Sequence, residues 1–126
     1  MPYKILIVDN APYARKLLRT KFEEHGHTVI GEAENVKEAI EYYWKFKPDL
    51  VSMDMMLTAE SGIDGIRALI KLDPNARIIV ISAMADKDTI SRALSYGAKS
   101  YSTKASDWHS IEEAIRQAFL PPKEPT

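Results

Sequence analysis

The chain has 126 residues, of which 45% are hydrophobic and 28% charged, as expected of one folded globular domain. Seventeen lysines and arginines nearly balance 18 aspartates and glutamates, so the composition gives no electrostatic indication of nucleic-acid or membrane binding. There is no cysteine, which excludes disulfides and thiolate metal sites. No apolar run approaches the roughly 20 residues of a membrane span, and the first ten residues do not resemble a signal peptide, so we expect a cytoplasmic protein.

Strands and helices are expected to alternate along the chain. Short apolar runs predict strands at 4–8, 27–33, 49–53 and 77–82, and a weaker pattern predicts a fifth at 99–104. A helical stripe of apolar residues follows each strand. The five stripes are Tyr13, Leu17, Leu18 and Phe22; Val36, Ala39, Ile40 and Tyr43; Ile66, Leu69 and Ile70; Ile90, Ala93 and Leu94; and Ile111, Ile115, Ala118 and Phe119.

Residues typical of helix ends support this assignment. Pro12 suits a first helical turn, and Asn35, Asp86 and Asp107 suit N-caps. Residues 121–126, "PPKEPT", cannot continue a helix. We therefore predict one domain over residues 1–120, followed at 121–126 by a proline-rich tail or the start of a linker.

Five strand–helix repeats predict an α/β fold, a single doubly wound (βα)5 parallel sheet with helices on both faces. In such sheets, ligands bind at the carboxyl ends of the strands. The residues expected at that edge are polar at four of five strand ends: Asp9 and Asn10, Asp54, Ser82 with Ala83, and Lys104.

Asp54 is the most unusual of these residues, because it interrupts the otherwise uncharged run "LVSMDMML" at 50–57. A buried carboxylate is costly unless something pairs with it. Two neighbouring carboxylates also require a cation, and without His or Cys in the set we expect Mg²⁺ or Mn²⁺. An aspartate beside a metal, a hydroxyl and an ammonium suits phosphoryl transfer, with Ala83 small enough for its N–H to approach a phosphoryl oxygen.

Each of these residues also has an ordinary structural explanation. An aspartate after a strand often caps the next helix, Ser82 could bond locally, and Lys104 could be a solvated charge. The joint placement at one sheet edge favours a site.

Four stretches carry a resemblance to a known family: "ILIVDNAPYARKLL", "KPDLVSMDMM", "ARIIVISAM" and "ALSYGAKSYSTKA". They closely resemble the receiver domain of two-component response regulators, the CheY-like family. The resemblance extends in order, with the family's spacing, to about residue 120. It implies a five-stranded parallel sheet of order 2-1-3-4-5.

The resemblance also implies a function. Asp54 would accept a phosphoryl group from the phosphohistidine of a sensor histidine kinase, and the chain would catalyse only its own phosphorylation and dephosphorylation. The implied Mg²⁺ ligands are Asp9, Asn10, Asp54 and the backbone carbonyl of Met56.

The remaining family positions concern switching. Ser82 and Lys104 match the residues that contact the phosphoryl group, and Tyr101 matches an aromatic that turns inward when Ser82 moves. The alternative is that Tyr101 is simply a half-buried aromatic residue on an edge strand, without a role in switching. We expect residues of about 86–119 to form a docking surface for a downstream protein, and an ordinary solvated face is the alternative. The stretch "SAM" (82–84) favours the chemotaxis type.

The sequence departs from the family at three places. Asn10 stands where most receivers have a second acid, so we expect weaker Mg²⁺ binding. Ala105 replaces a proline that usually follows the lysine matched by Lys104. The stretch "LTAESG" at 57–62 lacks a second proline that the family commonly has beside the site.

Three other interpretations remain open. These departures favour a pseudo-receiver, a protein-interaction module that is never phosphorylated. An aspartyl phosphatase would need a second acid two residues after Asp54, where Met56 stands. A flavodoxin-like or nucleotide-binding domain would need a glycine-rich loop after the first strand, where the sequence is "VDNAPYA".

Overall fold

The computed structural model describes residues 2–57, 60–83, 86–104 and 107–121. Its main sheet has five parallel strands in the order β2-β1-β3-β6-β7, which confirms the predicted fold and strand order. These strands are β1 (Lys4–Val8), β2 (Thr28–Ala33), β3 (Leu50–Met53), β6 (Ile78–Ser82) and β7 (Ser100–Thr103). Each predicted strand is therefore present, to within one residue at either end.

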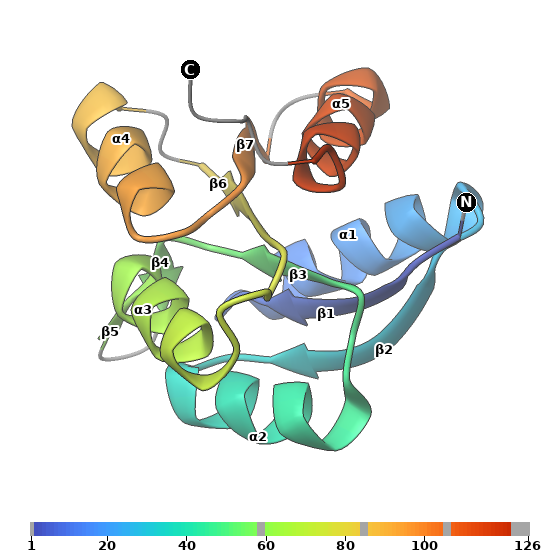
Figure 1. Ribbon diagram of the computed structural model, residues 1–126. Coiled ribbons are helices and arrows are strands. Elements are labelled where there is room, and N and C mark those ends of the chain that lie inside the picture. The colour runs from blue at the N-terminus through green and yellow to red at the C-terminus, as the bar shows by residue number, and fades with distance from the viewer. Residues whose placement is uncertain (1, 58–59, 84–85, 105–106, 122–126) are drawn as a thin grey trace.

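Five helices of the described chain cover the sheet, two on one face and three on the other (Figure 1). They are α1 (Pro12–Glu24), α2 (Val36–Phe46), α3 (Gly62–Leu72), α4 (Lys87–Ser95) and α5 (Trp108–Ala118). Because side chains alternate along a strand, β1 contributes Ile5 and Ile7 to the core under α1 and α5. Leu6 and Val8 belong to the core under α2, α3 and α4.

Local hydrogen bonds explain where most helices begin. The side chains of Asn35, Asp86 and Asp107 cap α2, α4 and α5, as predicted. Ser61 and Asp64 form a reciprocal capping box at the start of α3. By contrast, α1 has Pro12 in its first turn but no side-chain cap. The start of α1 therefore depends on other contacts.

Two features differ from the sequence prediction. On α1 only Leu18 and Phe22 are buried, whereas Tyr13 is 79% exposed and Leu17 is 42% exposed. A short antiparallel hairpin, β4 (Met56–Leu57) with β5 (Glu60–Ser61), also follows β3 and was not predicted. Strands of two residues are too short to show the alternation that identifies a strand.

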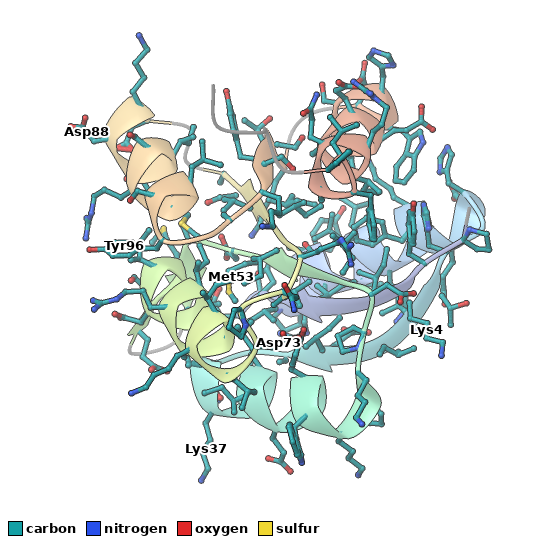
Figure 2. All side chains as sticks on the ribbon, viewed as in Figure 1. Lys4, Lys37, Met53, Asp73, Asp88 and Tyr96 are labelled. Carbon is teal, nitrogen blue, oxygen red and sulfur yellow. The ribbon has the colours of Figure 1, made fainter. Side chains whose placement is uncertain are left out.

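The side chains in Figure 2 show the same division between interior and surface. Met53 lies inside the molecule, whereas Lys37 of α2 and Asp88 of α4 extend outward. In the described part of the chain, no helix is both long and apolar enough to cross a membrane. Most of the predicted tail, residues 122–126, lies outside the described residues.

Candidate functional site

The ends of neighbouring strands bring two aspartates together. Val8 pairs with Met53 in the parallel register of β1 and β3, and the next residues along are Asp9 and Asp54. The N–H of Asp54 donates to the carbonyl of Val8 at 2.9 Å, and the N–H of Asp9 donates to the carbonyl of Ala33 at 2.9 Å. Strand pairing therefore continues through both residues and fixes their backbones at the carboxyl edge of the sheet.

Lys104 joins the two carboxylates. Its N–H donates to the carbonyl of Ser82 at 3.0 Å, which places it just beyond the β6–β7 pair. Its Nζ lies 2.7 Å from Oδ2 of Asp9 and 3.2 Å from Oδ2 of Asp54. The side chains of Asp9 and Asp54 are only 1% and 5% exposed, so this is a nearly buried cluster of two anions and one cation.

The electrostatics follow from this arrangement. Burial, and then the charge of Asp9, raise the pKa of Asp54, and Lys104 opposes that rise. Burial by itself lowers the pKa of Lys104, but the contacts with Asp9 and Asp54 outweigh burial and raise it. Lys104 therefore stays cationic and helps to keep Asp54 ionised, as a nucleophilic carboxylate must be.

The polar atoms of Asp9 identify the oxygen that suits a metal ion. Its Oδ1 accepts from the N–H of Ala11 at 2.9 Å, and its carbonyl accepts from Nη1 of Arg15 at 2.7 Å. Oδ2 is buried and accepts no well-directed hydrogen bond within the described residues, although Lys104 lies nearby as an ion-pair partner. A buried carboxylate oxygen in this situation suits a hard cation.

The described residues contain no cluster of three or more His, Cys, Asp or Glu side chains that could hold a metal. Mg²⁺, however, usually keeps several waters and uses only one or two carboxylates. The pair Asp9 and Asp54, with oxygen ligands only, therefore fits Mg²⁺ and does not fit a metal that needs nitrogen or sulfur ligands.

Gly62, the first residue of α3, shapes the loop after Asp54. Its N–H donates to the carbonyl of Met55 at 2.8 Å. A Cβ at this position would overlap the carbonyl oxygen of Asp54 and lie 2.7 Å from Cα of Met55. Only glycine lets α3 pack this closely against the loop. Neither Gly62 nor Arg15 could be identified from the sequence, because each contacts the backbone of a site residue, and no side-chain pattern reveals such a contact.

The other predicted site residues lie around this cluster. Ser82 ends β6, is 1% exposed, and pairs in register with Thr103. Asn10 and Ala83 are exposed at the same sheet edge, and Met56 is 59% exposed. Ala105 lies outside the described residues.

The predicted docking surface contains a groove of about 620 Å³ between α4, β7 and α5. Tyr101 is 47% exposed on the edge strand β7 and lines this groove together with Lys99 and His109. Tyr96, at the end of α4, lies beneath the guanidinium of Arg67 at 4.9 Å. The exposed surface of this region thus combines aromatic and cationic side chains.

Comparison with known proteins identifies the family. The sequence model of the family described as the response regulator receiver domain matches residues 5–116 of this chain. Chemotaxis protein CheY of Thermotoga maritima is 39% identical over 117 residues, which cover 93% of this chain and 98% of that protein. CheY of Bacillus subtilis is 35% identical over 119 residues, covering 94% of this chain and 99% of the relative.

Solved structures of response regulators are similar to this chain. A LuxR-family two-component response regulator from Aurantimonas sp. has a TM-score of 0.87 and 32% identity, covering 92% of this chain and 84% of the other. CheY of Borrelia burgdorferi, solved in a complex with CheX, BeF₃ and Mg²⁺, has a TM-score of 0.87 and 28% identity, covering 96% and 92%. The chain belongs to the response regulator receiver domains, the CheY-like family of two-component signalling.

Proposed function

We propose that this receiver accepts a phosphoryl group on Asp54 from the phosphohistidine of a sensor histidine kinase, in a reaction that requires Mg²⁺. The observation that carries the proposal is the buried contact of Lys104 with both Asp9 and Asp54. A structural cap would not need two buried carboxylates at one cation.

The chain's own residues can perform the transfer. A carboxylate oxygen of Asp54 forms the bond to phosphorus, the bond from phosphorus to the histidine nitrogen of the kinase breaks, and imidazole leaves. Lys104 donates a hydrogen bond to Oδ2 of Asp54 at 3.2 Å and orients the carboxylate. Lys104, the hydroxyl of Ser82 and the N–H of Ala83 would receive the three phosphoryl oxygens, a role that the 3.2 Å distance between Lys104 Nζ and Oδ2 of Asp54 supports for the lysine.

Mg²⁺ would be held by Asp9, Asn10, Asp54 and the carbonyl of Met56, and when bound it offsets negative charge on the phosphoryl group. The chemistry acts only on the chain itself, so we assign no enzymatic activity towards other substrates. Mn²⁺ meets the same oxygen-ligand requirement.

The test is the intact mass of the protein after incubation with a small-molecule phosphodonor, with and without Mg²⁺. We expect a Mg²⁺-dependent gain of one phosphoryl group that Asp54→Asn abolishes. A gain that persists in Asp54→Asn would contradict the assignment of the acceptor.

Output is proposed to pass through the surface formed by α4, β7 and α5. A phosphoryl group adds about −1.5 to −2 charge units and can shift an equilibrium between two arrangements of this region. Movement of Ser82 towards the phosphoryl group would let Tyr101 turn inward and change the groove that it lines. The similarity to CheY proteins favours a chemotaxis protein as the downstream partner.

The alternative is a pseudo-receiver that binds partners without phosphorylation. Asn10 favours it, because the amide lowers the negative charge available to a metal. The absence of any mass gain at high Mg²⁺ would support this alternative.

A further inference from the structure

Arg15 on α1 links the acidic site to β2. One end of its guanidinium, Nη1, donates to the backbone carbonyl of Asp9 at 2.7 Å. Its Nε donates to Oε1 of Glu32 at 3.2 Å. The side chain is only 16% exposed, so this link is largely shielded from water.

Glu32 anchors Arg15 from the strand side. Its other carboxylate oxygen accepts from Nε of Arg19 at 2.6 Å, so the carboxylate is held between two guanidinium groups. Glu32 lies in β2 and pairs in register with Ile7 of β1, two residues before Asp9. The anchor therefore belongs to the rigid sheet and not to a loop.

The turn that Arg15 contacts has few other constraints. It connects β1 to α1, and α1 lacks a side-chain cap. Within the described residues, the side chain of Asn10 is exposed and makes no hydrogen bond. Two hydrogen bonds hold this turn: the N–H of Ala11 donates to Oδ1 of Asp9, and Nη1 of Arg15 donates to the carbonyl of Asp9.

We propose that Arg15 is a positioning residue for Mg²⁺ binding, which fixes the backbone turn that presents Asp9 and Asn10 at the sheet edge. The proposal rests on the proposed function of this site. Groups that orient metal ligands usually change affinity by tenfold or more when they are removed. Arg15 touches the backbone of a ligand and not the metal, so it acts through geometry.

The direction in which Mg²⁺ affinity changes in Arg15→Met distinguishes a positioning role of Arg15 from the effect of its charge. As a nearby cation, Arg15 repels Mg²⁺, so its charge alone makes binding weaker. Arg15→Met would therefore tighten Mg²⁺ binding if only charge mattered. If Arg15 positions the turn, Arg15→Met weakens Mg²⁺ binding.

The test compares Arg15→Met with Arg19→Met by NMR titration of the full chain with Mg²⁺. Arg19 is the matched control because it pairs with the same glutamate from the same helix but has no contact with Asp9. We expect Arg15→Met to raise the Mg²⁺ dissociation constant about tenfold and Arg19→Met to leave it within about twofold. Unchanged or tighter binding in Arg15→Met would overturn the proposal.

A second variant covers the case in which Arg15→Met does not fold. Glu32→Gln keeps Arg15 but weakens its anchor, and it also removes one negative charge. We therefore expect it to lower Mg²⁺ affinity more than Glu23→Gln, which makes the same change of charge at the partner of Arg19. A loss in Glu32→Gln no greater than in Glu23→Gln would count against positioning through this anchor.

A metal-free measurement separates this proposal from the proposed function. The N–H of Ala11, which bonds Oδ1 of Asp9, should exchange with solvent faster in Arg15→Met than in Arg19→Met. If the wild type bound no Mg²⁺ at all, the proposed function would fail, yet faster exchange would still show that Arg15 fixes the turn. Equal exchange in the two variants would reject that role.

Discussion

At the scale of single residues, Asp9 shows how the site is built. Its N–H, carbonyl and Oδ1 are hydrogen-bonded to Ala33, Arg15 and Ala11. Oδ2 lies 2.7 Å from Nζ of Lys104 and accepts no well-directed hydrogen bond from a described residue. Three hydrogen bonds, one of them from the side chain of Arg15, therefore fix Asp9 and leave Oδ2 as its remaining oxygen.

Gly62 imposes a comparable constraint on Asp54. We expect Gly62→Ala to lower the free energy of unfolding by about 3 kcal/mol, because the new methyl group must displace backbone atoms. Phosphorylation should slow as well, because the overlap falls on the carbonyl of Asp54. Urea unfolding and the rate of mass gain measure the two effects.

Gly26→Ala is the control for this variant. Gly26 has a φ of +88°, but a methyl group added there would meet nothing within 4 Å, so only backbone strain of about 1 kcal/mol is expected. Equal losses of stability in the two variants would show that the overlap at Gly62 has no consequence.

Asn10 sets the charge of the metal site. Asn10→Asp adds a carboxylate at an exposed position next to Asp9, and ligand charge is a main determinant of affinity for hard cations. We expect Mg²⁺ to bind about tenfold more tightly, a gain of roughly 1.4 kcal/mol. A Mg²⁺ titration of the two proteins measures this.

The same substitution elsewhere provides the control. Asn35→Asp exchanges one good N-cap residue for another at the start of α2 and should leave Mg²⁺ affinity unchanged. If Asn10→Asp bound Mg²⁺ no more tightly than the wild type, Asn10 would not explain a weak site.

At the scale of elements, the strands could be predicted because central parallel strands are continuously apolar. The apolar stripes correctly predicted the positions of the helices, but not every residue of a stripe is buried. Tyr13 belongs to the stripe of α1, yet it is 79% exposed, because α1 rests on the sheet mainly through Leu18 and Phe22. Periodicity shows which residues share a face and does not show how much of that face is covered.

The junction of α1, β2 and α5 is an aromatic cluster. Trp108 stacks on His25 with ring centroids 3.8 Å apart and makes an edge contact with Phe22. His27 accepts a hydrogen bond at Nδ1 from the N–H of Tyr3 at 3.1 Å. That bond requires Nδ1 to be unprotonated, so protonation of His27 must break it.

This predicts a dependence of stability on pH. Burial, followed by the N-terminal amine and His25, lowers the pKa of His27 from its ordinary value of 6.5, and Glu112 opposes the change. The unfolded state therefore binds a proton more readily, and the free energy of unfolding should fall as pH drops below about 6.5. Urea unfolding between pH 7.5 and 5.5 measures this slope, and His27→Gln should flatten it. A slope that is unchanged in His27→Gln would exclude His27 as its source.

At the scale of the whole molecule, topology explains how much of the site could be predicted. All strands of a parallel sheet end at one edge, so Asp9, Asp54 and Lys104 could be placed together from strand order alone. The structure brings these three together. Arg15 and Gly62 could not be predicted, because their roles depend on the path of a turn and on a close helix–loop approach.

The buried site also affects the stability of the whole molecule. Two carboxylates share one ammonium, so the cluster keeps a net negative charge in the interior when no metal is bound. We expect Asp54→Asn to raise the free energy of unfolding in Mg²⁺-free buffer by about 1 kcal/mol, as when a strained functional group is neutralised. Mg²⁺ should stabilise the wild type, by about 2.7 kcal/mol at 100 times its dissociation constant, and should stabilise Asp54→Asn less.

Urea unfolding with and without Mg²⁺ measures both differences. Asp88→Asn is the control, because Asp88 is an exposed carboxylate in the first turn of α4. Its removal should cost a few tenths of a kcal/mol at most and should not change the response to Mg²⁺. If Asp54→Asn were less stable than the wild type without Mg²⁺, the ion pair with Lys104 would outweigh the repulsion from Asp9. The ionised site would then raise the free energy of unfolding and would not lower it.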